Sequence, residues 1–474
     1  MEDQTRLAVE QALKSGADYA EARTQRDVGH TLTLNNGIPE PVTVTRRLGI
    51  GIRVLVGGSM GFASTNSLET SQIRTSAETA VKIARAATRL TSKPSKLAPE
   101  ESWEDKWEVR MNIDIREVSI EEKFNVLYSI EKALSQEQVN ISLPSRILLL
   151  DDELTEKFYQ NSEGSRIRGI VPRISLFFIL TGEDKGKGTI QRMRHEAQSR
   201  GWEAVKEWNP PAIATDEARM LGRMLREGKQ PPTGEIDLVL GSEVTGIICH
   251  ESCGHPQEAD RILGREGAQA GESYVTREML GKRIGSEHVT IIDDPTLPNS
   301  YGFYMYDDEG VKAKPRTLIK DGIISDLLHN RETAAEFGVS SNAAARSVAY
   351  DREPIIRMGN TFMKPEDYTL EELVEDVKSG VYMKSFMEWN IDDRRYNQRY
   401  VGLEAYAIED GRIATPVRNP ILEVTTPGLY GSVDAVGKEM EYAGATCGKG
   451  DPQQGAPVWT GGPPIRIRKI RLGG

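Results

Sequence analysis

The sequence predicts an α+β protein, with an N-terminal domain of helices and antiparallel strands followed by a β-rich C-terminal domain that carries a helix with two histidines. Helical and strand patterns are interleaved without the regular spacing of strand–helix–strand units. Beyond residue 290, short strand patterns separated by Pro and Gly dominate. A chain of 474 residues exceeds one ordinary domain, so we expect two units, over 1–230 and 231–474.

In the first unit, helices are predicted where apolar residues recur on one face. They span 3–15 with Gly16 as C-terminal cap, 73–84, 124–134 with a capping box at Ser119 and Glu122, and 220–225. Strands are predicted where apolar and polar residues alternate between turns. They span 30–34, 42–44, 48–56, 60–63 and 146–181 with a turn at 161–164. Gly49 and Gly51 lie within a strand pattern and open no helix, so a dinucleotide-binding loop is not expected.

The second unit begins after Pro231-Pro232-Thr233-Gly234, a predicted hinge. A short apolar strand at 236–240 leads through Gly241-Ser242 into a helix that carries two histidines. The metal-binding helix is therefore expected to pack against a mostly β half.

The hexapeptide His250-Glu251-Ser252-Cys253-Gly254-His255 places a carboxylate between two imidazoles, as zinc hydrolases do to hold a metal and activate water. The usual motif spaces the histidines four apart, on one helix face. Here they are five apart, which separates the rings by roughly 140° on a regular helix. Either this is a buried helix with two hydrogen-bonded histidines and a solvated glutamate, or a π-type bulge, eased by Gly254, restores the shared face.

Three cysteines, Cys249, Cys253 and Cys447, are too few for a disulfide framework and indicate a reducing compartment. Cys447 lies between glycines in a predicted polar loop, where it is a poor core residue and a good ligand. Cys253 is not favoured as a nucleophile partnered by His255, because two helical steps separate their side chains by about 200°.

Composition excludes several classes of function. A net charge of −11 disfavours a nucleic-acid partner, and no apolar run approaches the ~20 residues that span a membrane. The charged start lacks a signal-peptide core, so a cytoplasmic protein is expected. The acidic groups Asp293-Asp294 and Asp307-Asp308-Glu309 have Pro and Gly neighbours and indicate turns rather than cation sites. The basic cluster of Arg466, Arg468, Lys469 and Arg471 predicts a terminal strand with one solvated face and one slip in its alternation.

The chain resembles the TldD/PmbA family, also called modulators of DNA gyrase, and in particular its TldD branch. The resemblance covers nearly the whole chain. It rests on the hexapeptide, the segments 16–20, 51–55, 61–66, 258–260, 293–298, 307–311 and 357–361, and Cys447-Gly448-Lys449. Where a glycine-rich stretch is expected, this chain instead reads Glu388-Trp389-Asn390-Ile391-Asp392-Asp393-Arg394-Arg395.

The resemblance implies a zinc metallopeptidase that cleaves unfolded or flexible polypeptides. Carried over by position, His250, His255 and Cys447 are the zinc ligands, and Glu251 is the general base that activates a zinc-bound water. It also implies a dimer, with a PmbA/TldE-like partner or of two identical chains. The alternative is a non-catalytic, zinc-stabilised interaction protein that modulates a partner such as a topoisomerase.

Three further residues are candidates with weaker support. Glu258 is expected either to orient a ligand histidine or to face solvent. His329 and Tyr301 are candidate donors to the developing oxyanion, which the sequence alone does not assign.

Overall fold

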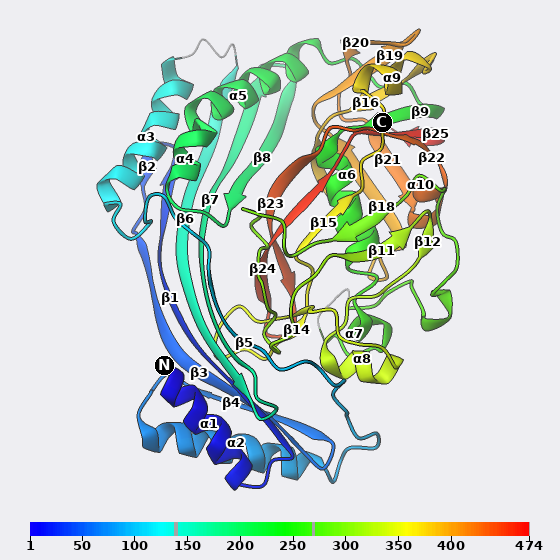
Figure 1. Ribbon diagram of the computed structural model, residues 1–474. Helices are drawn as coiled ribbons and strands as arrows, with labels where there is room; N and C mark the ends of the chain where they lie inside the picture. Colours follow the sequence, from blue (N-terminus) through cyan, green and yellow to red (C-terminus); the bar gives the residue numbers. More distant parts are fainter. Residues whose placement is uncertain (137–140, 268–270, 474) are drawn as a thin grey trace.

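The computed structural model describes residues 1–136, 141–267 and 271–473. Figure 1 shows long strands curving along one side of the molecule, with the C-terminal half packed beside them. The fold is α+β with a β-rich C-terminal half, as the sequence predicts. No helix in the described ranges is both long and apolar enough to cross a bilayer.

The described N-terminal half contains an eight-stranded sheet in the order β4-β3-β1-β6-β7-β5, with β2 beside β1 and β8 beside β7. The strands are β1 Tyr19–Asn35, β2 Ile38–Pro39, β3 Thr43–Val56, β4 Ser59–Thr65, β5 Glu104–Glu108, β6 Ser142–Asn161, β7 Arg166–Asp184 and β8 Gly188–Gln198. The predicted strands exist, but β1 is much longer than the expected 30–34. Gly49 and Gly51 do lie in β3, where an added Cβ would meet Tyr350.

Helices cover this sheet near its two ends (Figure 1). They are α1 Glu2–Lys14, α2 Thr70–Ala87, α3 Ile120–Gln136, α4 Glu203–Trp208 and α5 Pro210–Glu227. α1 and α2 bury small apolar residues such as Ala8 and Ala77 against β1 and β3. α3 and α5 bury larger residues such as Leu127 and Leu221 against β6 and β7. The amphipathic patterns read from the sequence therefore correspond to real packing faces.

The C-terminal half is built on two larger sheets, counted over the described residues. One has nine strands and includes β17-β18-β21-β25-β9-β16-β19-β20, and the other has six in the order β12-β11-β10-β15-β24-β23. The strands are β9 Gly234–Leu240, β10 Ile291–Asp293, β11 Arg316–Lys320, β12 Ile323–Ile324, β13 Ala345–Arg346, β14 Ile355–Ile356, β15 Asn360–Met363, β16 Ser379–Met383, β17 Phe386–Ile391, β18 Asn397–Gly402, β19 Ala405–Glu409, β20 Arg412–Pro416, β21 Ile421–Thr425, β22 Val433–Val436, β23 Glu441–Lys449, β24 Gln454–Gly462 and β25 Ile465–Gly473.

Short helices connect these strands, and α6 is buried at the centre of this half (Figure 1). They are α6 Ser242–Cys249, a π-helical turn at His250–Gly254, α7 Ala259–Ile262, a 3₁₀ turn at Arg277–Met279, α8 Arg331–Phe337, α9 Leu370–Glu375 and α10 Thr426–Gly431. The C-terminal core surrounds α6 with apolar residues of both sheets, including Leu240, Val458 and Ile465. Packing on all sides thus fixes the helix that carries the histidines.

The terminal basic strand, β25, differs in part from the prediction. The expected slip is a register shift between Ile467 and Ile470. The prediction of a solvent-exposed face, however, is wrong for Arg466, which is 5% exposed and paired with Asp434 at 3.0 Å. The sequence could not indicate this burial, because Asp434 comes from the neighbouring strand β22.

Buried polar contacts join the two halves of the molecule. Arg53 of β3 pairs with Glu309 at 2.5 Å, and Tyr159 of β6 donates to the Glu309 carbonyl at 2.7 Å. Arg331 of α8 pairs in turn with Glu163 at 2.8 Å. The halves are therefore held together by the buried Arg53–Glu309 pair and by the partly exposed Arg331–Glu163 pair, as well as by apolar contact.

Candidate metal centre

The helix from Ser242 ends in a widened turn. α6 gives way at His250 to a π-helical turn, in which the His255 amide donates to the His250 carbonyl at 3.1 Å, five residues back. Of the two alternatives that the five-residue spacing leaves open, this is the π-type bulge, and it brings both rings to one face. Gly254 is needed for room, because a Cβ there would meet Met358 Sδ at 1.9 Å.

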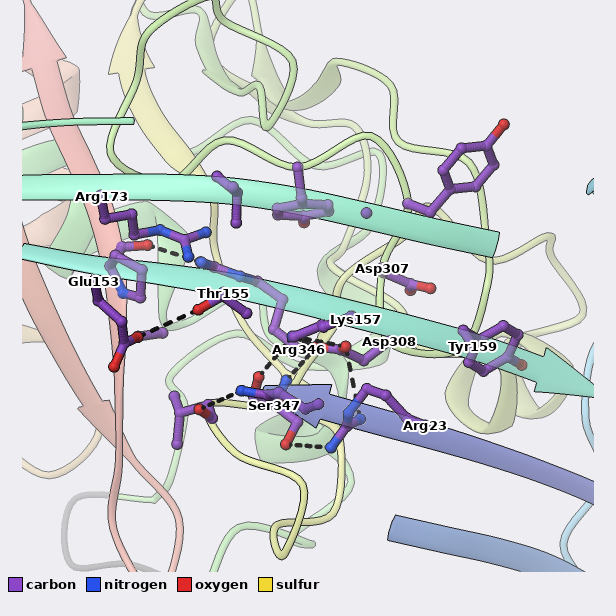
Figure 2. A pocket seen from close by; sticks show the side chains of 18 of the residues that line it. Arg23, Glu153, Thr155, Lys157, Tyr159, Arg173, Asp307, Asp308, Arg346 and Ser347 are labelled. Atoms are coloured by element: carbon purple, nitrogen blue, oxygen red, sulfur yellow. Dashed lines mark hydrogen bonds and ion pairs between the residues drawn. The ribbon is translucent and has the colours of Figure 1, made fainter. Parts of the chain in front are cut away.

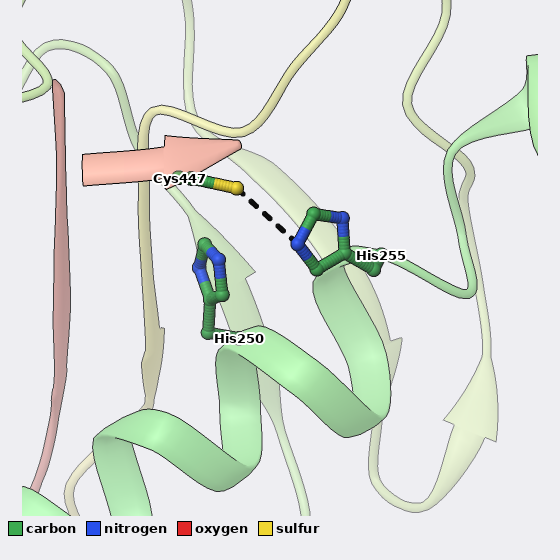
Figure 3. Close-up of side chains that lie close together, drawn as sticks. All are labelled: His250, His255 and Cys447. Atoms are coloured by element: carbon green, nitrogen blue, oxygen red, sulfur yellow. Dashed lines mark hydrogen bonds between the residues drawn. The ribbon is translucent and has the colours of Figure 1, made fainter. Parts of the chain in front are cut away.

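The three predicted ligands come together. One ligand atom from each of His250, His255 and Cys447 lies within 4.8 Å of the other two, and the residues are 4%, 2% and 7% exposed. Cys447 Sγ is 3.2 Å from His255 Nε2 (Figure 3). Cys447 lies on strand β23, not in the polar loop predicted, because its strand pairs residue by residue with β24 despite the flanking glycines.

The surroundings of Cys447 favour a thiolate. Burial raises the pKa of its thiol, but the charges of His255 and Arg357 outweigh burial and bring it to about 7. Arg357 donates to the Cys447 carbonyl and, at 2.7 Å, to the carbonyl of Gln454 on the partner strand. A thiolate is the form in which cysteine binds metals.

Glu258 orients one of the histidines. Its Oε2 lies 3.0 Å from His255 Nδ1, which leaves Nε2 directed at Cys447. Glu258 is fully buried, so the solvated alternative is wrong. Burial raises its pKa, but Lys449, His255 and Arg261 more than compensate and hold it well below the ordinary value. A carboxylate bonded to the second ring nitrogen is the usual support of a metal-binding histidine.

Glu251 has a partner that sequence reasoning missed. Arg395, in the turn between β17 and β18, donates through Nη1 to Glu251 Oε2, and both residues are buried. The turn is held by Asp392, which accepts from the Tyr396 and Asn397 amides. This is the segment that departs from the expected glycine-rich stretch. Its polar run is compatible with a turn, but no local pattern indicates that the turn reaches a helix 144 residues earlier in the chain.

The weaker candidates lie elsewhere. Over the described residues, no hydrogen bond or ring contact joins His329 or Tyr301 to the three ligands; His329 Nδ1 lies 3.1 Å from Thr333 Oγ1, and the Tyr301 ring packs on His195. Cys253 Sγ lies 3.6 Å from Gln257 Oε1, with its pKa raised well above the ordinary value by burial.

The acidic groups behave as structural residues. Asp293 accepts from Arg316, from the Gly359 amide at 2.9 Å and from Thr361 at 3.0 Å. Asp307 accepts from the amides of Glu309 and Val311, each at 2.9 Å. Their oxygens are used by protein donors, as expected of turns.

The cluster fits a zinc ion. Two imidazoles and one thiolate are typical zinc ligands, and three protein ligands are the number found in catalytic sites. His250 Nδ1 is buried and has no hydrogen-bond partner among the described residues. A buried ring nitrogen of this kind normally has a partner, so the site has room for a further group that the protein itself does not supply.

Comparison with known families gives the class of the protein. Models of the PmbA/TldA metallopeptidases match domain 1 over residues 20–84, the central domain over 113–225 and the C-terminal domain over 233–474. These matches cover most of the chain. It therefore belongs to the TldD/PmbA family, the family that its motifs indicate.

Individual relatives agree. A metalloprotease of Methanocaldococcus jannaschii is 31% identical, with 97% of each chain covered. A protein of Saccharolobus solfataricus described as a zinc metalloprotease TldD homolog is 27% identical, over 98% of this chain and 99% of its own. The solved structure of TldE from Thermococcus kodakarensis has the same fold, with a TM-score of 0.75 at 17% identity over 99% and 100% of the two chains.

Proposed function

We propose that this protein is a zinc-dependent metallopeptidase that hydrolyses peptide bonds in unfolded or flexible polypeptides. The observation that carries the proposal is the buried cluster of His250, His255 and Cys447 beside Glu251. Membership of a metallopeptidase family and relatives described as metalloproteases support it.

In this proposal, His250 and His255 as neutral imidazoles and Cys447 as thiolate hold the ion. Bound there, zinc supplies Lewis acidity, which polarises a peptide carbonyl and lowers the pKa of water to about 7. Glu251 accepts the proton of the attacking water at a carboxylate oxygen and passes it to the leaving amine. Glu258 keeps the His255 ring in the orientation that leaves Nε2 for the metal.

We propose Arg395 as the donor to the developing oxyanion, in place of His329 and Tyr301. Its Nη1 holds Glu251, whereas its buried Nε has no hydrogen-bond partner in the described chain. A guanidinium presents several N–H groups in a fixed plane, so one arginine can orient the base and donate to the substrate oxygen.

Burial supports the proposed preference for flexible substrates. Ligands that are 2–7% exposed are shielded from the surface of a folded domain, and an extended segment needs the least room to approach them. We further propose a dimer, either with a TldE-like partner or of two identical chains, and a cytoplasmic location, which the three free cysteines support.

The test replaces Glu251 by Gln, which keeps the shape of the side chain but cannot accept the proton. We expect Glu251→Gln to retain one zinc per chain by elemental analysis and to lose cleavage of an unfolded casein-like substrate. Unchanged proteolysis in this variant would rule out Glu251 as the general base. A wild-type protein that binds zinc but cleaves no unfolded substrate would instead favour the non-catalytic interaction protein.

A further inference from the structure

A cavity lies on the side of the β23–β24 hairpin opposite the metal cluster. This cavity of about 440 Å³ is enclosed by strands β1, β6 and β7 on one side and by the 301–308 and 346–348 segments and the β23–β24 hairpin on the other (Figure 2). Thr446 lines it, whereas the next residue on β23, Cys447, faces His255. Because successive strand residues point to opposite faces, the cavity and the metal cluster lie on opposite faces of one hairpin.

Two guanidiniums in its wall have no carboxylate partner among the described residues. Arg173 donates to the carbonyls of Tyr301 at 3.2 Å and Phe303 at 3.3 Å. Arg346, 7% exposed, donates to the carbonyls of Met358 and, at 2.9 Å, Pro457. Backbone carbonyls orient a guanidinium without neutralising it, and Arg346 also lies over the Tyr304 ring at 5.1 Å. Neither arginine forms a direct ion pair within the described ranges, so both can still pair with an anionic ligand.

The surroundings of both arginines disfavour their charged forms. Burial lowers the pKa of Arg346 to about 10, and the positive charge of Arg173 acts in the same direction. Burial likewise lowers the pKa of Arg173, despite the attraction of acidic groups such as Glu153. An anion that binds beside both guanidiniums would stabilise their buried positive charges.

Further polar groups in the lining are unsatisfied. The indole N–H of Trp107 and Nε of Arg23 are buried without a hydrogen-bond partner in the described ranges. Tyr301, Tyr304 and Tyr306 add aromatic surface. A cavity of roughly 300–1,000 Å³ with apolar walls and a few convergent polar groups is typical of a small-ligand site.

The acidic residues of the lining restrict the charge of the ligand. Asp151, Glu153, Asp307 and Asp308 all line the cavity. Asp308 is balanced by Lys157 at 2.8 Å and Arg23 at 3.6 Å, and Glu153 by Arg47 at 3.0 Å. A singly charged carboxylate can use the two free guanidiniums, whereas a doubly charged phosphate would also meet repulsion from these acids.

We propose that this cavity binds the free carboxylate of a short peptide, with Arg173 and Arg346 as its cationic partners. Arg47, whose side chain is 46% exposed, lies where the cavity reaches solvent. The proposal rests on the peptidase function for the source of the ligand, since each cut creates a new carboxylate. Because Arg346 also bonds to Pro457, which pairs with Thr446, an occupied cavity contacts the hairpin that carries Cys447.

The test measures binding in the zinc-loaded Glu251→Gln protein, so that no probe is consumed. Calorimetry compares an N-acetylated tripeptide bearing a free carboxylate, the same tripeptide as its amide, and inorganic phosphate. We expect the acid to bind, the amide to bind at least about tenfold more weakly, and phosphate not to compete, because a charge-assisted bond is lost in the amide. Equal binding of acid and amide, or no binding of the acid at millimolar concentration, would refute the proposal. Competition by phosphate would replace it with an inorganic-anion site.

Three variants locate the site: two that should lose binding and one matched control. Arg346→Gln should weaken binding of the tripeptide acid at least about tenfold. Arg168→Gln, on the same strand as Arg173 but bonded to Glu156 away from the cavity, should not. Val171→Phe, which fills the cavity without changing its charge, should abolish binding while zinc content and thermal unfolding stay normal. Undiminished binding in Val171→Phe would place the peptide elsewhere. Because binding is measured without cleavage, failure of the peptidase proposal and failure of this one are distinguishable.

Discussion

Arg395 and Glu251 form a buried ion pair at the centre of the proposed chemistry. Arg395→Gln removes the charge that orients the base and the donor proposed for the oxyanion. We expect kcat to fall about 10²-fold or more, in line with the loss of an oxyanion donor, while zinc content is retained. Steady-state cleavage of an unfolded substrate measures this. Arg394→Gln is the matched control, because its side chain is 61% exposed and pairs only loosely with Glu272, at 3.8 Å; an equal loss in both variants would contradict the assignment.

Cys447 is the one proposed ligand that lies far from the hexapeptide in sequence. Cys447→Ala removes a third of the protein ligands, so we expect zinc after dialysis to fall well below one ion per chain. Cys253→Ala is the matched control, since Cys253 is also buried and lies in the π-helical turn beside His250 and His255, but contacts Gln257. Elemental analysis of the two variants checks this. Undiminished zinc in Cys447→Ala would exclude Cys447 as a ligand.

Residues that carry an unusual chemical pattern could be predicted from the sequence, and residues that act through tertiary contact could not. His250, His255 and Cys447 attract attention by their type and spacing, and Glu258 follows from its closeness to His255. Arg395 is one of three arginines on the polar hairpin of β17 and β18, with Arg394 and Arg399. Only the docking of that hairpin on the widened turn gives it a role.

Among the elements, the π-helical turn is the one on which the site depends most. In Gly254→Ala, the new methyl group would collide with Met358. We expect the free energy of unfolding to fall by about 1–3 kcal/mol, as for overpacked cores, and zinc affinity to fall with it because the turn sets the position of His255. Thermal unfolding and zinc titration measure both effects.

A double variant tests the reason for this loss. Gly254→Ala combined with Met358→Ala should recover part of the zinc affinity, because the smaller side chain makes room for the methyl group. If the double variant binds zinc no better than Gly254→Ala alone, the steric explanation is wrong.

Helices and strands can be predicted well where a local periodicity defines them. They are predicted less well where pairing with a neighbouring strand sets their length. The helix at 3–15 is α1, and the strands expected at 48–56 and 60–63 lie within β3 and β4. The true length of β1 was not predictable, because the long neighbours β3 and β6 extend its pairing beyond the alternating stretch. Cys447 was expected in a loop for the same reason: its strand exists through pairing with β24.

At the scale of the whole molecule, sequence reasoning identified the fold class but not how the halves are joined. Glu309 belongs to an acidic segment with the composition of a turn, and a turn is what its backbone forms. Its fully buried side chain nevertheless reaches Arg53 of the other half and accepts from the Arg331 amide at 2.7 Å. Such a contact depends on two distant segments meeting, which no local pattern encodes.

This buried connection predicts that the two halves unfold together. Glu309→Gln leaves the Arg53 charge with Glu21 as its remaining partner at 2.7 Å. Breaking a buried pair costs about 3–5 kcal/mol, and the surviving pair puts the expected loss near the lower end. Calorimetry should show one transition in both proteins, shifted to lower temperature in Glu309→Gln. The exposed pair of Glu388 with Arg399 provides the control, since Glu388→Gln should cost less than about 1 kcal/mol. Two separate transitions in the wild-type protein would mean that the halves are independent and that the buried pairs do not couple them.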